Sequence, residues 1–86
     1  MRAQDILPDD VNQSDMNGTT VRKGTVGAFL VNARAWCASA TSDADRREAE
    51  QHMLEALPAL HALGLFEVLA IRDERLRTLL AQAARS

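Results

Sequence analysis

The chain has 86 residues, a formal net charge of −2, and 47% apolar against 26% charged residues. A chain of this length forms one hydrophobic core, so we expect a single domain without a large buried active-site cleft. The nearly balanced charge argues against sequence-independent binding to nucleic acid. Aromatic residues make up only 3% of the chain, which leaves few large side chains for the core and favours self-association.

Cysteine content and hydropathy restrict the cellular environment. Cys37 is the single cysteine of the sequence, so no disulfide can form within the chain. No apolar run follows Arg2, and no stretch approaches the roughly 20 apolar residues that span a membrane. We therefore expect a cytoplasmic protein that does not associate with membranes.

The N-terminal quarter of the chain is polar and acidic. Its composition predicts a flexible acidic arm over residues 1–15, followed by a single helical domain over 16–86. Asn17-Gly18 is typical of a tight turn, and the β-branched residues after it favour a strand. A short hairpin that pairs about 9–13 with 19–23 is one outcome, and such a hairpin needs the helices for support.

The first helix is predicted over residues 25–40, with Thr25 as its N-cap. Apolar residues recur there at three- and four-residue spacing: Val26, Phe29, Leu30, Ala33, Trp36, Cys37 and Ala40. The opposite face carries Arg34 as its one charge. A helix this apolar on both sides is either central in the fold or covered by a partner.

The second helix begins at Ser42, where Asp45 three residues later forms a variant of the capping box. Its apolar stripe consists of Ala49, Met53, Ala56, Leu57 and Leu60. Pro58 interrupts this pattern, so the helix either kinks there or ends near Leu57 and restarts at Pro58. Gly64 is a natural stop in the left-handed conformation.

Residues 65–71 fit a helical turn, a strand or a buried crossing segment equally well. Asp73 then caps a last helix, whose inward residues are Leu76, Leu79, Leu80 and Ala83. The predicted fold is mainly α, a small domain of three to four helices with a short N-terminal hairpin or arm.

One local cluster is a candidate anion site at the start of the first helix. It consists of Arg22, Lys23, Gly24, Thr25 and Gly27. Free backbone amides at a helix N-terminus bind anions, but the spacing matches no phosphate-binding loop. The simpler interpretation is that Gly24 forms the strand-to-helix turn and Gly27 permits close packing.

No residue pattern indicates catalysis, a metal or a cofactor. His52 and His61 are nine residues apart, a poor spacing for ligands on one helix. Cys37 lies on an apolar helix face where a thiol is inert, and no strand-turn-helix elbow surrounds Ser39. Segment 58–64 has almost no side chain suited to reading bases, so we expect neither an enzyme nor a nucleic-acid-binding protein.

From Thr20 to Phe66 the chain resembles a family of small uncharacterised bacterial proteins, a domain of unknown function. The resemblance is carried by Val21 to Leu30 (VRKGTVGAFL) with Asn32, by Leu57-Pro58-Ala59-Leu60 and by Leu63-Gly64-Leu65-Phe66. It covers about half the chain, and the sequence departs from the pattern after Phe66. It implies a bacterial cytosolic protein and no particular activity, ligand or site residue.

The expected function is therefore a non-enzymatic protein-interaction module or accessory subunit, most simply a homodimer. The candidate interface residues are Val31 and Ala35 on the outer face of the first helix, and Phe66, Leu69 and Ile71 in the apolar run that follows. The alternative is a regulatory protein that binds a small ligand or an anion at the 22–27 turn.

Overall fold

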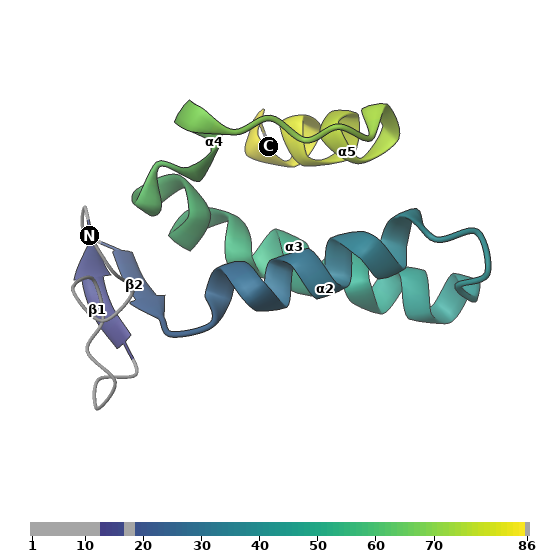
Figure 1. The fold of residues 1–86 in the computed structure, drawn as a ribbon, viewed down its shortest axis with the longest axis horizontal. Coiled ribbons are helices and arrows are strands. Elements are labelled where there is room, and N and C mark those ends of the chain that lie inside the picture. Colours follow the sequence, from purple (N-terminus) through teal and green to yellow (C-terminus); the bar gives the residue numbers. More distant parts are fainter. Residues whose placement is uncertain (1–12, 17–18, 86) are drawn as a thin grey trace.

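The computed structural model describes residues 13–16 and 19–85 of the chain. These residues form a two-stranded hairpin beside a set of helices (Figure 1). The elements are β1 (Gln13–Met16), β2 (Thr19–Arg22), α2 (Thr25–Cys37), α3 (Asp43–Leu63), α4 (Leu65–Val68) and α5 (Glu74–Arg85). The prediction of a small, mainly α domain is confirmed.

The first strand of the hairpin lies later in the sequence than predicted. β1 and β2 pair antiparallel, with Ser14 opposite Val21 and Met16 opposite Thr19. The expected first strand at 9–13 was wrong, because the pairing register begins directly beside the two residues that separate Met16 from Thr19. Residues 1–12, most of the predicted acidic arm, lie outside the described residues, and 13–15 belong to β1.

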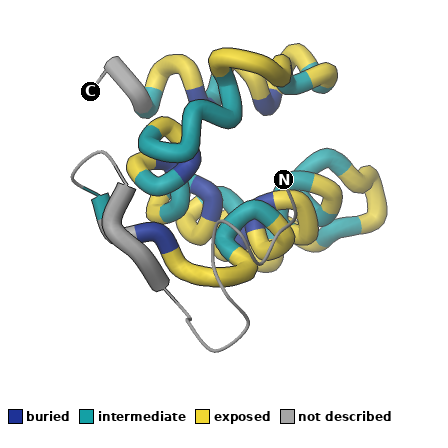
Figure 2. Tube along the Cα trace, turned by 60° about the vertical axis from the view of Figure 1, so that its left-hand side comes forward, coloured by how far each residue is buried: buried dark blue, intermediate teal, exposed yellow. Residues whose placement is uncertain are grey.

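The core lies along the contact between α2 and α3. Met53 and Leu60 of α3 are completely buried, and Phe29 of α2 packs against them. In the tube of Figure 2, buried positions recur along α3, while much of α2 and α5 is exposed. Val21 is also buried and lies on the strand that contacts α3. The helix pair therefore forms the base on which the hairpin and the C-terminal segment rest.

Helix ends follow local capping chemistry at most positions. The Ser42 hydroxyl accepts a hydrogen bond from the Asp45 amide at 3.1 Å, as predicted. Gly64 closes α3 in the left-handed conformation at φ 80°, also as predicted. The expected Thr25 cap was wrong: Gly24 occupies that position at φ 88°, and the Thr25 hydroxyl instead donates to the Arg22 carbonyl at 2.7 Å.

Pro58 does not end α3, which runs as one helix from Asp43 to Leu63. Its ring lies on the exposed side, where water can reach the Leu54 carbonyl that lacks an amide donor. Met53, Leu57 and Leu60 lie buried on both sides of the proline, so core packing keeps both halves in one continuous helix.

The segment after Gly64 begins with a helical turn, one of the three expected conformations, and forms neither a strand nor a buried crossing segment. α4 is a single helical turn, and an extended stretch from Leu69 leads to α5. Asp73 caps α5 by accepting a hydrogen bond from the Leu76 amide at 3.0 Å. The Arg75 guanidinium lies 5.8 Å from the centroid of the Trp36 ring, which links α5 to α2.

We predict that Leu60→Ala lowers the free energy of unfolding by about 2–5 kcal/mol, because it leaves a cavity in the α2–α3 contact. Arg47→Ala is the control: Arg47 is exposed on the same helix and lies outside the core, and its truncation costs less than about 1 kcal/mol. Urea unfolding followed by circular dichroism measures both. Equal losses would contradict the assignment of the core.

Candidate functional site

An apolar groove of about 430 Å³ lies between α2 and the segment that joins α4 to α5. We call it the α2–α4 groove. Its α2 wall consists of Val26, Phe29, Leu30, Ala33, Arg34 and Cys37. Its other wall is formed by Leu65 and Phe66 of α4, residues 69–73 and Leu76 of α5.

Local backbone geometry builds this groove. The left-handed Gly64 turns the chain back over α3, and Phe66 then meets Phe29 edge-to-face with ring centroids 6.1 Å apart. The two rings close the floor of the groove. Leu30 and Leu69 stand on its opposite walls with 53% and 58% of their surface exposed. Large apolar side chains exposed this far are the kind of surface that a binding partner covers.

Two arginines and one aspartate are the charged residues that line the groove. Arg34 and Arg72 are both exposed lining residues, and no ion pair is recorded for either within the described part of the chain. Asp73 is the one acidic residue in the lining, and its carboxylate is occupied by the cap of α5. The groove therefore presents an apolar floor with a net positive edge.

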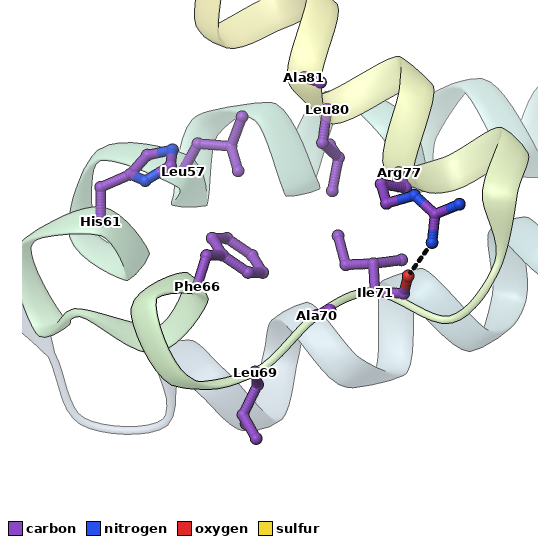
Figure 3. A pocket seen from close by; sticks show the side chains of 9 residues that line it. All are labelled: Leu57, His61, Phe66, Leu69, Ala70, Ile71, Arg77, Leu80 and Ala81. Carbon is purple, nitrogen blue, oxygen red and sulfur yellow. Dashed lines mark hydrogen bonds between the residues drawn. The ribbon is translucent and has the colours of Figure 1, made fainter.

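A second hollow, of about 280 Å³, lies on the other side of the same segment (Figure 3). Phe66, Ile71 and Leu80 point into it, whereas Leu69 points away toward the opposite side (Figure 3). The Arg77 guanidinium donates a hydrogen bond to the Ile71 carbonyl at 3.0 Å, which holds the extended stretch against α5. Residues 66–71 thus form a partition with the groove on one side and this hollow on the other.

Cys37 lies at the end of the groove beside Asp73. Burial raises the pKa of its thiol, and the charge of the Asp73 carboxylate together with a hydrogen bond to it raises that pKa further. The Leu76 amide in turn holds the pKa of Asp73 below its ordinary value. At neutral pH the thiol is protonated, the unreactive form.

The predicted anion cluster is assembled at the β2–α2 turn. Arg22, Lys23 and Gly24 are exposed there, and the first turn of α2 contains no acidic residue and no side-chain cap. The expectation that Gly27 permits close packing was wrong, because a Cβ at Gly27 meets nothing within 4 Å among the described residues. These features describe an open helix terminus, and the anion site stays a prediction.

The predicted interface residues fall into two groups. Leu69 and Val31 are exposed, at 58% and 68%, and Ala35 is half-buried on α2. Phe66 and Ile71 are half-buried and pack against the core, so they form the inner surface of the groove and expose little area to a partner. Leu30 and Ala40 were expected in the core and are exposed, which was wrong.

Val68, at 84% exposure, belongs to the predicted apolar run but was not among the residues named for the interface. Periodicity placed residues on helix faces but carried no signal of which face a neighbouring element covers. The exposed positions therefore became visible only when the path of α4 was known.

The remaining chemistry-bearing residues do not converge. Among the described residues, no group of three His, Cys, Asp or Glu side chains is arranged to hold a metal ion. His52 is exposed on α3, while His61 lies against Phe66 with ring centroids 5.6 Å apart. Within the same residues, no helix is both long and apolar enough to cross a bilayer.

Comparison of the chain with protein-family models, curated proteins and solved structures gives no match. The resemblance to a small bacterial family therefore stays a prediction. What can be said of function rests on the groove and its surroundings.

The anion prediction has a direct test. If an anion binds at the β2–α2 turn, inorganic phosphate shifts the backbone amide NMR signals of residues 24–28 in a saturable way. The donors are the amides before Ala28, because the Ala28 amide already donates to the Gly24 carbonyl. The amides at the start of α3, a capped terminus, serve as the control. Unmoved signals at 24–28 would remove this alternative.

We predict that Asp73→Asn accelerates alkylation of Cys37 at neutral pH, because loss of the neighbouring negative charge lowers the pKa of the thiol and raises its thiolate fraction. The substitution removes the neighbouring negative charge but keeps a side chain that can cap α5. Iodoacetamide labelling followed by mass spectrometry measures the rate. Asp43→Asn, at an exposed position on α3, is the control and leaves the rate unchanged.

Proposed function

We propose that the protein is a non-enzymatic interaction module that forms a homodimer, acting alone or as an accessory subunit in the bacterial cytoplasm. The observation that carries the proposal is the α2–α4 groove, with Leu30 and Leu69 exposed on its two walls. The occupant proposed for it is a second copy of the chain.

The exposed apolar surface continues beyond the groove. Val31 and Val68 are 68% and 84% exposed, and both neighbour a groove-lining residue in sequence. Isolated exposed apolar side chains are ordinary on a monomer, whereas a run of them around a depression marks a contact surface. Two such side chains, Leu30 and Leu69, line the groove itself, and Val31 and Val68 are their neighbours in the chain.

The size of the core supports the same proposal. Of the described residues, only Met53 and Leu60 have fully buried side chains. Small domains bury a limited fraction of their surface and are marginally stable as monomers. A dimer contact over the groove removes further apolar surface from water at roughly 25 cal/mol per Å².

The chemistry around the groove supports binding more than catalysis. The thiol nearest to it, that of Cys37, is held in its protonated form by burial and by Asp73. The Asp73 carboxylate is in turn occupied by the Leu76 amide. Neither group is poised as a nucleophile or a general base.

We predict that the wild-type protein has a molar mass close to twice 9.4 kDa by light scattering, and that Leu30→Glu converts it to a monomer. A carboxylate on the apolar wall cannot be desolvated by the partner without a large cost. Leu69→Glu tests the opposite wall. Ala44→Glu, at an exposed position on α3, is the control and leaves the dimer intact.

Circular dichroism at low protein concentration shows whether each variant still folds, which is expected because both leucines are more than half exposed. A wild-type mass that stays at one chain at every concentration would overturn the proposal.

A further inference from the structure

Val68 neither packs in the core nor lines a depression. It is 84% exposed, the highest value among the exposed large apolar side chains of the described residues. It stands on α4 between the exposed Glu67 and the groove-lining Leu69. α4 therefore presents an apolar knob with a carboxylate beside it, next to an apolar groove with an arginine rim.

We propose that α4 of each copy docks into the α2–α4 groove of the other, so that Val68 enters between Leu30 and Leu69 while Glu67 faces Arg34. This inference rests on the proposed function and specifies which element of the second copy fills the groove.

Symmetry favours this pairing. In a two-fold dimer the same patch on both copies must be self-complementary: if one residue contacts a second, the second also contacts the first. The knob and the groove lie side by side in one chain, because Val68 directly precedes Leu69. A single two-fold axis therefore brings both knobs into both grooves and closes the assembly at two chains.

Charge favours it as well. The rim of the groove carries Arg34 and Arg72, and the knob carries Glu67. In the described part of the chain these three side chains form no ion pair, and the Glu67 carboxylate lies against Gly64 at the start of α4, so it turns outward when it pairs with Arg34 of the other copy. Complementary charges at the edge of a contact fix its orientation and disfavour alternatives that juxtapose like charges.

A second acidic surface, on α3, is an alternative partner for the arginines at the edge of the groove. The exposed side of α3 carries Asp43, Asp45 and Glu48 near its start. Contact of that surface with the groove would join two different patches, a head-to-tail arrangement that continues to longer assemblies unless it closes as a ring. The α4 arrangement is self-limiting, and this difference can be measured.

A stable dimer needs more contact area than α4 alone provides. A stable interface buries about 800 Å² on each partner, roughly an eighth of the 6357 Å² surface of this chain. One docked helical turn is smaller than that. The contact therefore extends onto α2 next to Leu30 and Arg34, where Val31 is exposed.

Charge reversal tests the register. We predict that Glu67→Arg and Arg34→Glu each raise the dimer dissociation constant about tenfold or more in sedimentation equilibrium, because each change places like charges in two symmetry-related pairs. The double variant restores the opposite pairing and returns the constant to within about threefold of the wild type. Glu48→Arg and Arg47→Glu, exposed on α3, are the matched controls and leave it unchanged.

The other outcomes are distinct. Single reversals without effect, or a double variant without rescue, overturn the α4 register even when Leu30→Glu still disrupts the dimer and the proposed function stands. Weakening by Glu48→Arg, with assemblies larger than two chains in the wild type, assigns the groove to α3 and also overturns it. A monomeric wild type overturns both the register and the proposed function.

Discussion

The packing of α2 against α3 is the contact on which the rest of the structure depends. Phe29 meets Met53 and Leu60 there, and every other element attaches to this pair. β2 adds Val21 to the base formed by α3, and α5 adds Leu76 and Leu80. Because so little of the chain is fully buried, these few side chains set both the stability of the domain and the shape of the surface it exposes.

The exposed groove follows from how the chain turns at Gly64. A left-handed residue at that point ends α3 and directs α4 across the helix pair, where Phe66 reaches Phe29. The Phe66 ring completes the packing around Phe29, and the residues that follow, Val68 and Leu69, remain exposed. The apolar residues on α2 that α4 does not reach, Leu30 and Val31, remain exposed for the same reason. The surface proposed as an interface is thus the part of an apolar sequence that one chain has too few elements to cover.

Sequence reasoning succeeded where a structure is determined by neighbouring residues. The caps at Ser42 and Asp73 and the stop at Gly64 depend on chemistry within three or four positions, and all three were predicted. Pro58 was ambiguous because the local preference for a break competes with the buried stripe on both sides, and packing prevailed.

The candidate groove was harder to predict than the helices that line it. Periodicity assigns Leu30 and Phe29 to the same face of α2, yet one is 53% and the other 4% exposed. What separates them is the position of Phe66, more than thirty residues away in the chain. Of the groove-lining residues, Phe66, Leu69 and Ile71 were anticipated from an apolar run alone, while the exposure of Leu30 required the tertiary structure.

The C-terminal helix α5, which follows the extended stretch, is attached to the rest of the domain by few contacts. α5 is fastened by two buried leucines, by Arg75 over Trp36 and by the Arg77–Ile71 hydrogen bond. These contacts are far fewer than those that join α2 to α3, so α5 can detach as a separate cooperative unit while the helix pair stays folded. We therefore expect its amide hydrogens to exchange with solvent faster than those of α3. The C-terminal helix is thus the natural point at which heat, proteases or a competing ligand begin to act on the protein.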